Sequence, residues 1–150
     1  MQINISTTSR SIDADSDRVF QALTDPLMVA SWRSPGNMKL SIMKYDAKAN
    51  GPISYKFESK DPTRHETYKI TGSFISVTRP QRIIAEEEIV TDITLLQGKT
   101  LIIYEVTYQA GTSQISVNRQ GIPGGIDISC ENGYWDYALT KMNDLLASRS

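Results

Sequence analysis

The sequence predicts an α+β protein with a curved antiparallel sheet of about seven strands, a long C-terminal helix and two short helices after the first strand. Three observations predict this fold class. Apolar residues recur at helical spacing over residues 16–24 and again over 128–146. Residues 38–119 instead alternate with a period of two, and turn residues divide them into short segments. This second pattern is typical of an antiparallel meander.

The N-terminal part predicts one strand and then two short helices. Residues 3–12 are rich in isoleucine, threonine and serine, which suits a first strand. Asp15 is the predicted N-cap of the first helix, because its side chain can accept a hydrogen bond from the first turn of that helix. The step from Asp25 to Pro26 ends that helix and begins a second one over 27–32, since Asp is a good N-cap and Pro a good first helical residue.

Six further strands are predicted in the alternating region. Turn residues such as Asn50-Gly51 and Ala110-Gly111 lie between them. The predicted strands cover residues 38–45, 53–59, 66–77, 82–90, 100–109 and 113–119. Residues 91–98 fit either the extension of a strand or a loop.

The segment GIPGG at 121–125 ends the sheet, and one long amphipathic helix follows it. The residues of its apolar face recur at spacings of about 3, 4 and 7. They are Ile128, Trp135, Leu139, Met142 and Leu146. A helix of about twenty residues is about 30 Å long, so this helix is long enough to cross the whole sheet.

Composition and charge favour one domain over residues 1–150 and exclude several partners. The chain of 150 residues has the usual length of one domain. Its net charge is −1, and no cluster of Lys and Arg is interleaved with aromatic residues, so we expect no nucleic-acid partner. The sequence has neither a secretion signal nor an apolar run of about 18 residues, so we expect a cytoplasmic protein without membrane insertion.

The sequence lacks the residue sets that hold metals or carry common catalytic chemistry. Cys130 is the only cysteine, which excludes an intramolecular disulfide and a multi-cysteine zinc site. His65 is the only histidine and lies in a polar stretch, so we expect it at the surface. No glycine-rich phosphate loop is present. We therefore expect no metal, no cofactor and no assignable catalytic residue.

Four motifs occur in order along the chain and resemble one family. They are ADSDRVFQALTDPLMVASWRSP at 14–35, DAKANGPISY at 46–55, GSFISVTRPQRI at 72–83 and GYWDYALTKM at 133–142. Together they resemble the bacterial proteins similar to the activator of heat-shock protein 90 ATPase. That family belongs to the START-like (SRPBCC) superfamily of helix-grip proteins, which includes the birch-pollen allergen and polyketide cyclases.

The sequence departs from the family pattern at three positions. Arg33 stands where a second aromatic residue is common, and Asn50 replaces a glycine. Tyr134 separates Gly133 from Trp135. Each motif by itself is weak, but their order makes the resemblance more specific for the fold than for the function.

The resemblance implies a cavity between the curved sheet and the helices. Alternation places aromatic and aliphatic side chains on the inner face of the sheet. The expected cavity residues are Trp32, Tyr55, Phe57, Tyr68, Ile70, Phe74, Tyr104, Tyr108, Tyr134 and Trp135. Trp32 is expected at the rim, where it either contacts a ligand or plugs the junction between the short helices and the sheet. Trp135 is expected to be buried, so Trp135→Ala should destabilise the protein more than Trp32→Ala.

Three functions remain open. The first is binding of a hydrophobic or amphipathic small molecule, lipid-like or aromatic, in a hydrophobic cavity lined with tyrosines. The second is catalysis of cyclisation, dehydration or hydrolysis by a tyrosine and an inward carboxylate, for which Glu87 and Glu105 are the candidates if they do not lie on a solvated face. The third is interaction with a chaperone or another protein through an exposed apolar patch at Leu95 and Leu96.

Overall fold

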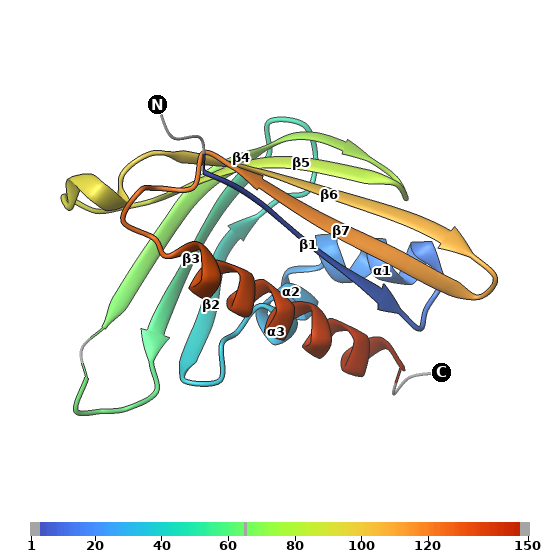
Figure 1. The fold of residues 1–150 in the computed structure, drawn as a ribbon, viewed down its shortest axis with the longest axis horizontal. Coiled ribbons are helices and arrows are strands. Elements are labelled where there is room, and N and C mark those ends of the chain that lie inside the picture. The colour runs from blue at the N-terminus through green and yellow to red at the C-terminus, as the bar shows by residue number, and fades with distance from the viewer. Residues whose placement is uncertain (1–3, 65, 148–150) are drawn as a thin grey trace.

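The computed structural model describes residues 4–64 and 66–147 and has the predicted helix-grip α+β architecture (Figure 1). The expectation for His65 lies outside the described residues. In chain order the elements are β1 (Ile5–Ile12), α1 (Ser16–Thr24), α2 (Pro26–Trp32), β2 (Met38–Tyr45), β3 (Pro52–Ser59), β4 (Thr67–Thr78), β5 (Arg82–Ile89), η1 (Thr94–Leu96), β6 (Lys99–Gln109), β7 (Thr112–Gln120) and α3 (Ile128–Ala147). The strands form an antiparallel sheet in the order β1-β7-β6-β5-β4-β3-β2.

Two aspartates begin the short helices as the sequence predicts. The carboxylate of Asp15 accepts a hydrogen bond of 2.8 Å from the backbone N–H of Arg18 at the start of α1. The carboxylate of Asp25 accepts one of 2.9 Å from Leu27 in α2, and Pro26 occupies the first turn of that helix. Each cap satisfies a backbone donor that would otherwise lack a partner. The two helices therefore form as separate elements.

Bulges and a left-handed residue accompany the curvature of the sheet. The register shifts between Ile42 and Lys44 in β2, and between Phe74 and Ser76 in β4. A bulge adds one residue to a strand and bends it. Asn50, before β3, has a φ of +66°, a conformation that asparagine tolerates better than most residues other than glycine. This tolerance explains how Asn50 replaces the glycine of the motif.

The core lies between the concave face of the sheet and the helices (Figure 1). α3 runs along β1 and also contacts α1 and α2. It spans 20 residues and buries Trp135, Leu139, Met142 and Leu146 of the predicted apolar face, whereas Ile128 is half-buried. Trp135 is only 2% exposed. Among the described residues, no helix is both long and apolar enough to cross a membrane.

Trp32 belongs to this core, which corrects its expected position at the rim. The side chain is 1% exposed, and its Nε1 donates a 2.7 Å hydrogen bond to the carbonyl of Ala22 in α1. Its ring centroid lies 6.3 Å from that of Trp135 in α3. The residue therefore joins α1, α2 and α3. Of the two interpretations of Trp32, contact with a ligand or filling of the junction between the short helices and the sheet, the structure supports the second.

Candidate functional site

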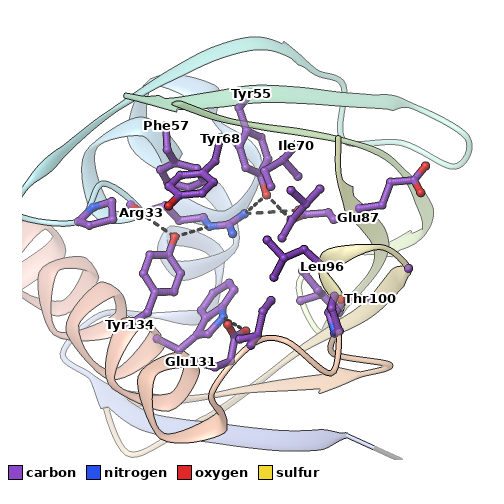
Figure 2. A pocket seen from close by; sticks show the side chains of 18 of the residues that line it. Arg33, Tyr55, Phe57, Tyr68, Ile70, Glu87, Leu96, Thr100, Glu131 and Tyr134 are labelled. Carbon is purple, nitrogen blue, oxygen red and sulfur yellow. Dashed lines mark hydrogen bonds and ion pairs between the residues drawn. The ribbon is translucent and has the colours of Figure 1, made fainter. Parts of the chain in front are cut away.

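A pocket of about 420 Å³ lies between the sheet and the first turns of α3 (Figure 2). Strands β3, β4, β5 and β6 supply one wall, and α3 with the segment before it supplies the other. Six of the predicted cavity residues line this pocket: Tyr55, Phe57, Tyr68, Ile70, Tyr134 and Trp135. Lining residues outside that prediction include Arg33, Met38, Glu87, Glu88, Ile102, Ile126 and Glu131.

The other four predicted cavity residues lie elsewhere. Trp32, Phe74 and Tyr104 are buried in the core, and Tyr108 is 50% exposed near the end of β6. Alternation correctly places Tyr104 on the inner face, where its ring packs 6.1 Å from the ring of Trp135. The helices fill most of that face, however, so side chains that share it do not all reach the pocket.

Three side chains form a buried network on the pocket wall, which we call the polar cluster: Arg33, Tyr55 and Glu87 (Figure 2). Nη1 of Arg33 donates to the Tyr55 hydroxyl at 2.7 Å and to Oε2 of Glu87 at 3.4 Å. The Tyr55 hydroxyl in turn donates to Oε1 of Glu87. Arg33 is 5% exposed and Glu87 is 7% exposed. Both oxygens of the buried carboxylate therefore have a donor.

Aromatic rings hold the guanidinium of Arg33 in place. Its Cζ lies 5.0 Å from the ring centroid of Tyr55 and 4.8 Å from that of Trp135, within the range of cation–π attraction. The Tyr134 hydroxyl accepts a hydrogen bond from Nε of Arg33 at 3.3 Å and donates one of 2.9 Å to the Arg33 carbonyl. Burial by itself lowers the pKa of Arg33, but the negative charges of Tyr134, Tyr55 and Glu87 when ionised raise it well above its ordinary value. Arg33 is therefore positively charged at neutral pH.

Sequence reasoning missed Arg33 as a site residue and noted it only as a departure from a family motif. An arginine at the end of a short helix is usually solvated, so nothing local indicates its burial. The signal in the sequence that could have indicated a buried cation is Glu87. Alternation along β5 directs some carboxylates inward, and a buried carboxylate requires a cation or hydrogen-bond donors. The structure places Glu87 inward and Glu105 on the exposed side of β6.

A second buried arginine lies behind Trp135. Arg119 is fully buried, and its guanidinium donates to Oγ1 of Thr8 and to Oδ1 of Asn132, both at 3.0 Å. Its Nε lies 3.7 Å from Oε1 of Glu131, and the same oxygen accepts a 3.1 Å hydrogen bond from Nε1 of Trp135. The Trp135 ring is thus fixed by Arg119 and Glu131 as well as by the polar cluster.

The connection between β5 and β6 forms one side of the pocket. It is a loop containing the short turn η1, which settles the two interpretations of residues 91–98. Leu96 lines the pocket, whereas Leu95 is 68% exposed. Of the two leucines predicted to form an exposed patch, only Leu95 is exposed. The Leu95 carbonyl accepts a 2.8 Å hydrogen bond from Gly125, where an added Cβ would lie 2.8 Å from that of Leu95. Only glycine allows this close approach.

The polar cluster predicts a specific alkaline destabilisation. Burial raises the pKa of Tyr55 well above its ordinary value, Arg33 opposes this shift and Glu87 adds to it. A raised pKa in the folded state stabilises the protein below pH about 10, and this stabilisation is lost as the pH rises through the folded-state pKa. The free energy of unfolding should therefore fall above pH about 10, by about 1.4 kcal/mol per pH unit for each such tyrosine.

Chemical denaturation at a series of alkaline pH values measures this slope. Tyr55→Phe should make this slope shallower by about 1.4 kcal/mol per pH unit, the contribution of one proton, because phenylalanine has no hydroxyl to ionise. Tyr108→Phe is the control, since that side chain is half exposed. An unchanged slope in Tyr55→Phe would contradict the prediction.

The curved sheet, the long C-terminal helix and the pocket between them define a START-like domain. The chain belongs to the family of Activator of Hsp90 ATPase homolog 1-like proteins, whose family model matches residues 13–147. This membership confirms the resemblance seen in the four sequence motifs. No curated protein matches the chain.

Solved bacterial structures share the fold. A protein from Chromobacterium violaceum superposes with a TM-score of 0.87 at 22% identity, covering 95% of this chain and 96% of that one. One from Rhodobacter sphaeroides gives 0.84 at 18% identity, covering 99% and 100%. A solution structure from Staphylococcus epidermidis gives 0.79 at 16% identity, covering 100% and 93%. At these identities the likenesses show the fold alone.

Proposed function

We propose that the protein binds a small hydrophobic or amphipathic molecule in the pocket of Figure 2. The observation that carries this proposal is the pocket itself. Its volume of about 420 Å³ falls in the range of known ligand sites, roughly 300 to 1,000 Å³, and its apolar walls surround a few convergent polar groups.

Aromatic side chains supply much of the wall. The ring of Phe57 meets those of Tyr55 and Tyr134 edge to face, with centroids 5.6 Å and 6.4 Å away. The Tyr134 and Trp135 rings are 5.5 Å apart. Such surfaces suit a ring-containing or acyl ligand, because aromatic pairs attract beyond the simple burial of area.

The polar cluster supports binding more than catalysis. A general base needs a carboxylate oxygen directed at the substrate proton. Oε1 of Glu87 accepts from Tyr55 and Oε2 accepts from Arg33, so both oxygens are already engaged within the protein. Glu105, the other carboxylate considered for catalysis, is exposed. Within residues 4–64 and 66–147, no set of three His, Cys, Asp or Glu side chains gathers as a metal site.

A ligand screen with a filled-pocket variant tests this function. We expect at least one class among fatty acids, sterols, flavonoids and polyketide-like aromatics to raise the melting temperature, since a ligand at a hundred times its Kd stabilises by about 2.7 kcal/mol. Ile70 lines the pocket from β4, so Ile70→Trp should fill the space and abolish the shift.

Lys69→Trp is the matched control, because its side chain is the exposed neighbour of Ile70 on the opposite face of β4. This variant should bind as the unmodified protein does. Binding that survives unchanged in Ile70→Trp would show that the pocket is not the site. If no ligand class stabilises the protein, the proposed function is wrong.

A further inference from the structure

One nitrogen of the Arg33 guanidinium is left to face the pocket. Nε donates to Tyr134, and Nη1 donates to Tyr55 and Glu87. Nη2 donates to none of the residues that the structure describes. Nη2 is nevertheless accessible, because the only fully buried side-chain nitrogen or oxygen atoms without a hydrogen-bond partner, among the described residues, are Nε of Arg10 and Nε of Arg119. Figure 2 shows the guanidinium pointing into the space between sheet and helix.

The charges around this space are already paired. Glu87 lines the pocket and compensates the charge of Arg33 at 3.4 Å. Glu131 also lines it and lies 3.7 Å from Arg119 behind the wall. Glu88 is a lining residue too, but alternation along β5 directs its side chain to the face opposite that of Glu87. An anionic ligand would lose its hydration and add a negative charge beside carboxylates whose cations are already paired.

We infer that the ligand is an uncharged molecule with an apolar body and a neutral hydrogen-bond acceptor, such as a ketone carbonyl, placed at Nη2 of Arg33. This inference rests on the proposed function and specifies its ligand class. A carbonyl satisfies the free donor without adding charge, and a hydrogen bond to a charged donor strengthens binding by about tenfold. A carboxylate of the same shape would bring a further negative charge to Arg33, whose own charge Glu87 already compensates.

Three matched naphthalenes test the inference on the unmodified protein at neutral pH. The probes are 2-acetonaphthone with a neutral carbonyl, 2-naphthoate with a carboxylate and 2-ethylnaphthalene with no acceptor, titrated by tryptophan fluorescence and by NMR. We expect the ketone to bind about tenfold more tightly than the ethyl compound, and the carboxylate to bind more weakly than either.

The possible outcomes separate this inference from the proposed function. Equal affinity for ketone and ethyl compound, or binding of the carboxylate as tight as that of the ketone, overturns the inference and leaves the proposed function intact. Binding of none of the three overturns both for ligands of this size. These results do not depend on any variant's ability to fold.

Two variants then locate the selectivity. The triple variant Arg33→Met/Tyr55→Phe/Glu87→Leu replaces the whole polar cluster with apolar groups, so it should lose the preference for the ketone over 2-ethylnaphthalene. Glu88→Gln is the control for charge, because alternation along β5 directs this carboxylate to the face opposite that of Glu87. It should leave the relative affinities of the three probes unchanged. A ketone preference that persists in a folded triple variant would overturn the role of Arg33.

Discussion

Replacement of Trp32 with alanine is expected to lower the free energy of unfolding by about 3 to 5 kcal/mol, the usual range for removing a large core aromatic. The ring is 1% exposed, so its removal leaves a cavity between α2 and α3. It also leaves the Ala22 carbonyl without its 2.7 Å hydrogen bond. Trp135→Ala should cost a similar amount. Chemical denaturation followed by circular dichroism measures both.

The control for this comparison is Tyr108→Ala, which removes a half-exposed aromatic outside the core and should have a much smaller effect. If Trp32→Ala lowers the free energy of unfolding much less than Trp135→Ala does, Trp32 lies at the rim of the cavity and not in the core. Ligand binding should change the emission of Trp135, which lines the pocket, rather than that of Trp32. The sequence predicts Trp32 at the rim of the cavity, and its burial reverses that expectation.

Replacement of Glu87 alone with leucine is expected to lower the free energy of unfolding by about 3 to 5 kcal/mol, because it leaves a buried charge without a counter-ion. The charge in question is that of Arg33, which is 5% exposed and lies 3.4 Å from the Glu87 carboxylate. The triple variant Arg33→Met/Tyr55→Phe/Glu87→Leu should recover most of this loss, since well-packed apolar groups can replace a buried ionic network at little cost.

Glu86→Leu is the matched control. Glu86 precedes Glu87 in β5, and its side chain is 37% exposed in a 3.6 Å ion pair with Lys99. Exposed pairs contribute little, so this change should alter stability by no more than about 1 kcal/mol. If the triple variant is as unstable as Glu87→Leu, packing rather than charge explains the cost. Thermal and chemical unfolding of the four proteins decide between these outcomes.

The sequence by itself determined the elements, their order and the inner face of the sheet. Asp15 and Asp25 begin the short helices through hydrogen bonds to residues two or three positions away, so these boundaries are local. Strand alternation is local as well, and it correctly directs Tyr55 and Tyr104 inward. The long amphipathic helix follows from one apolar face that includes Trp135.

Only the tertiary structure decided where along that inner face a pocket remains. Tyr55 and Tyr104 share the face and both are buried, yet of the two only Tyr55 lines the pocket, because Tyr104 packs against Trp135 of α3. The same packing separates two neighbours at the end of α2. Trp32 enters the core, whereas Arg33 turns to the pocket and meets partners 54 and 101 positions away in the sequence, Glu87 and Tyr134. Periodicity specifies the direction of a side chain within its own element, but burial and ion pairing depend on elements brought together from distant parts of the chain.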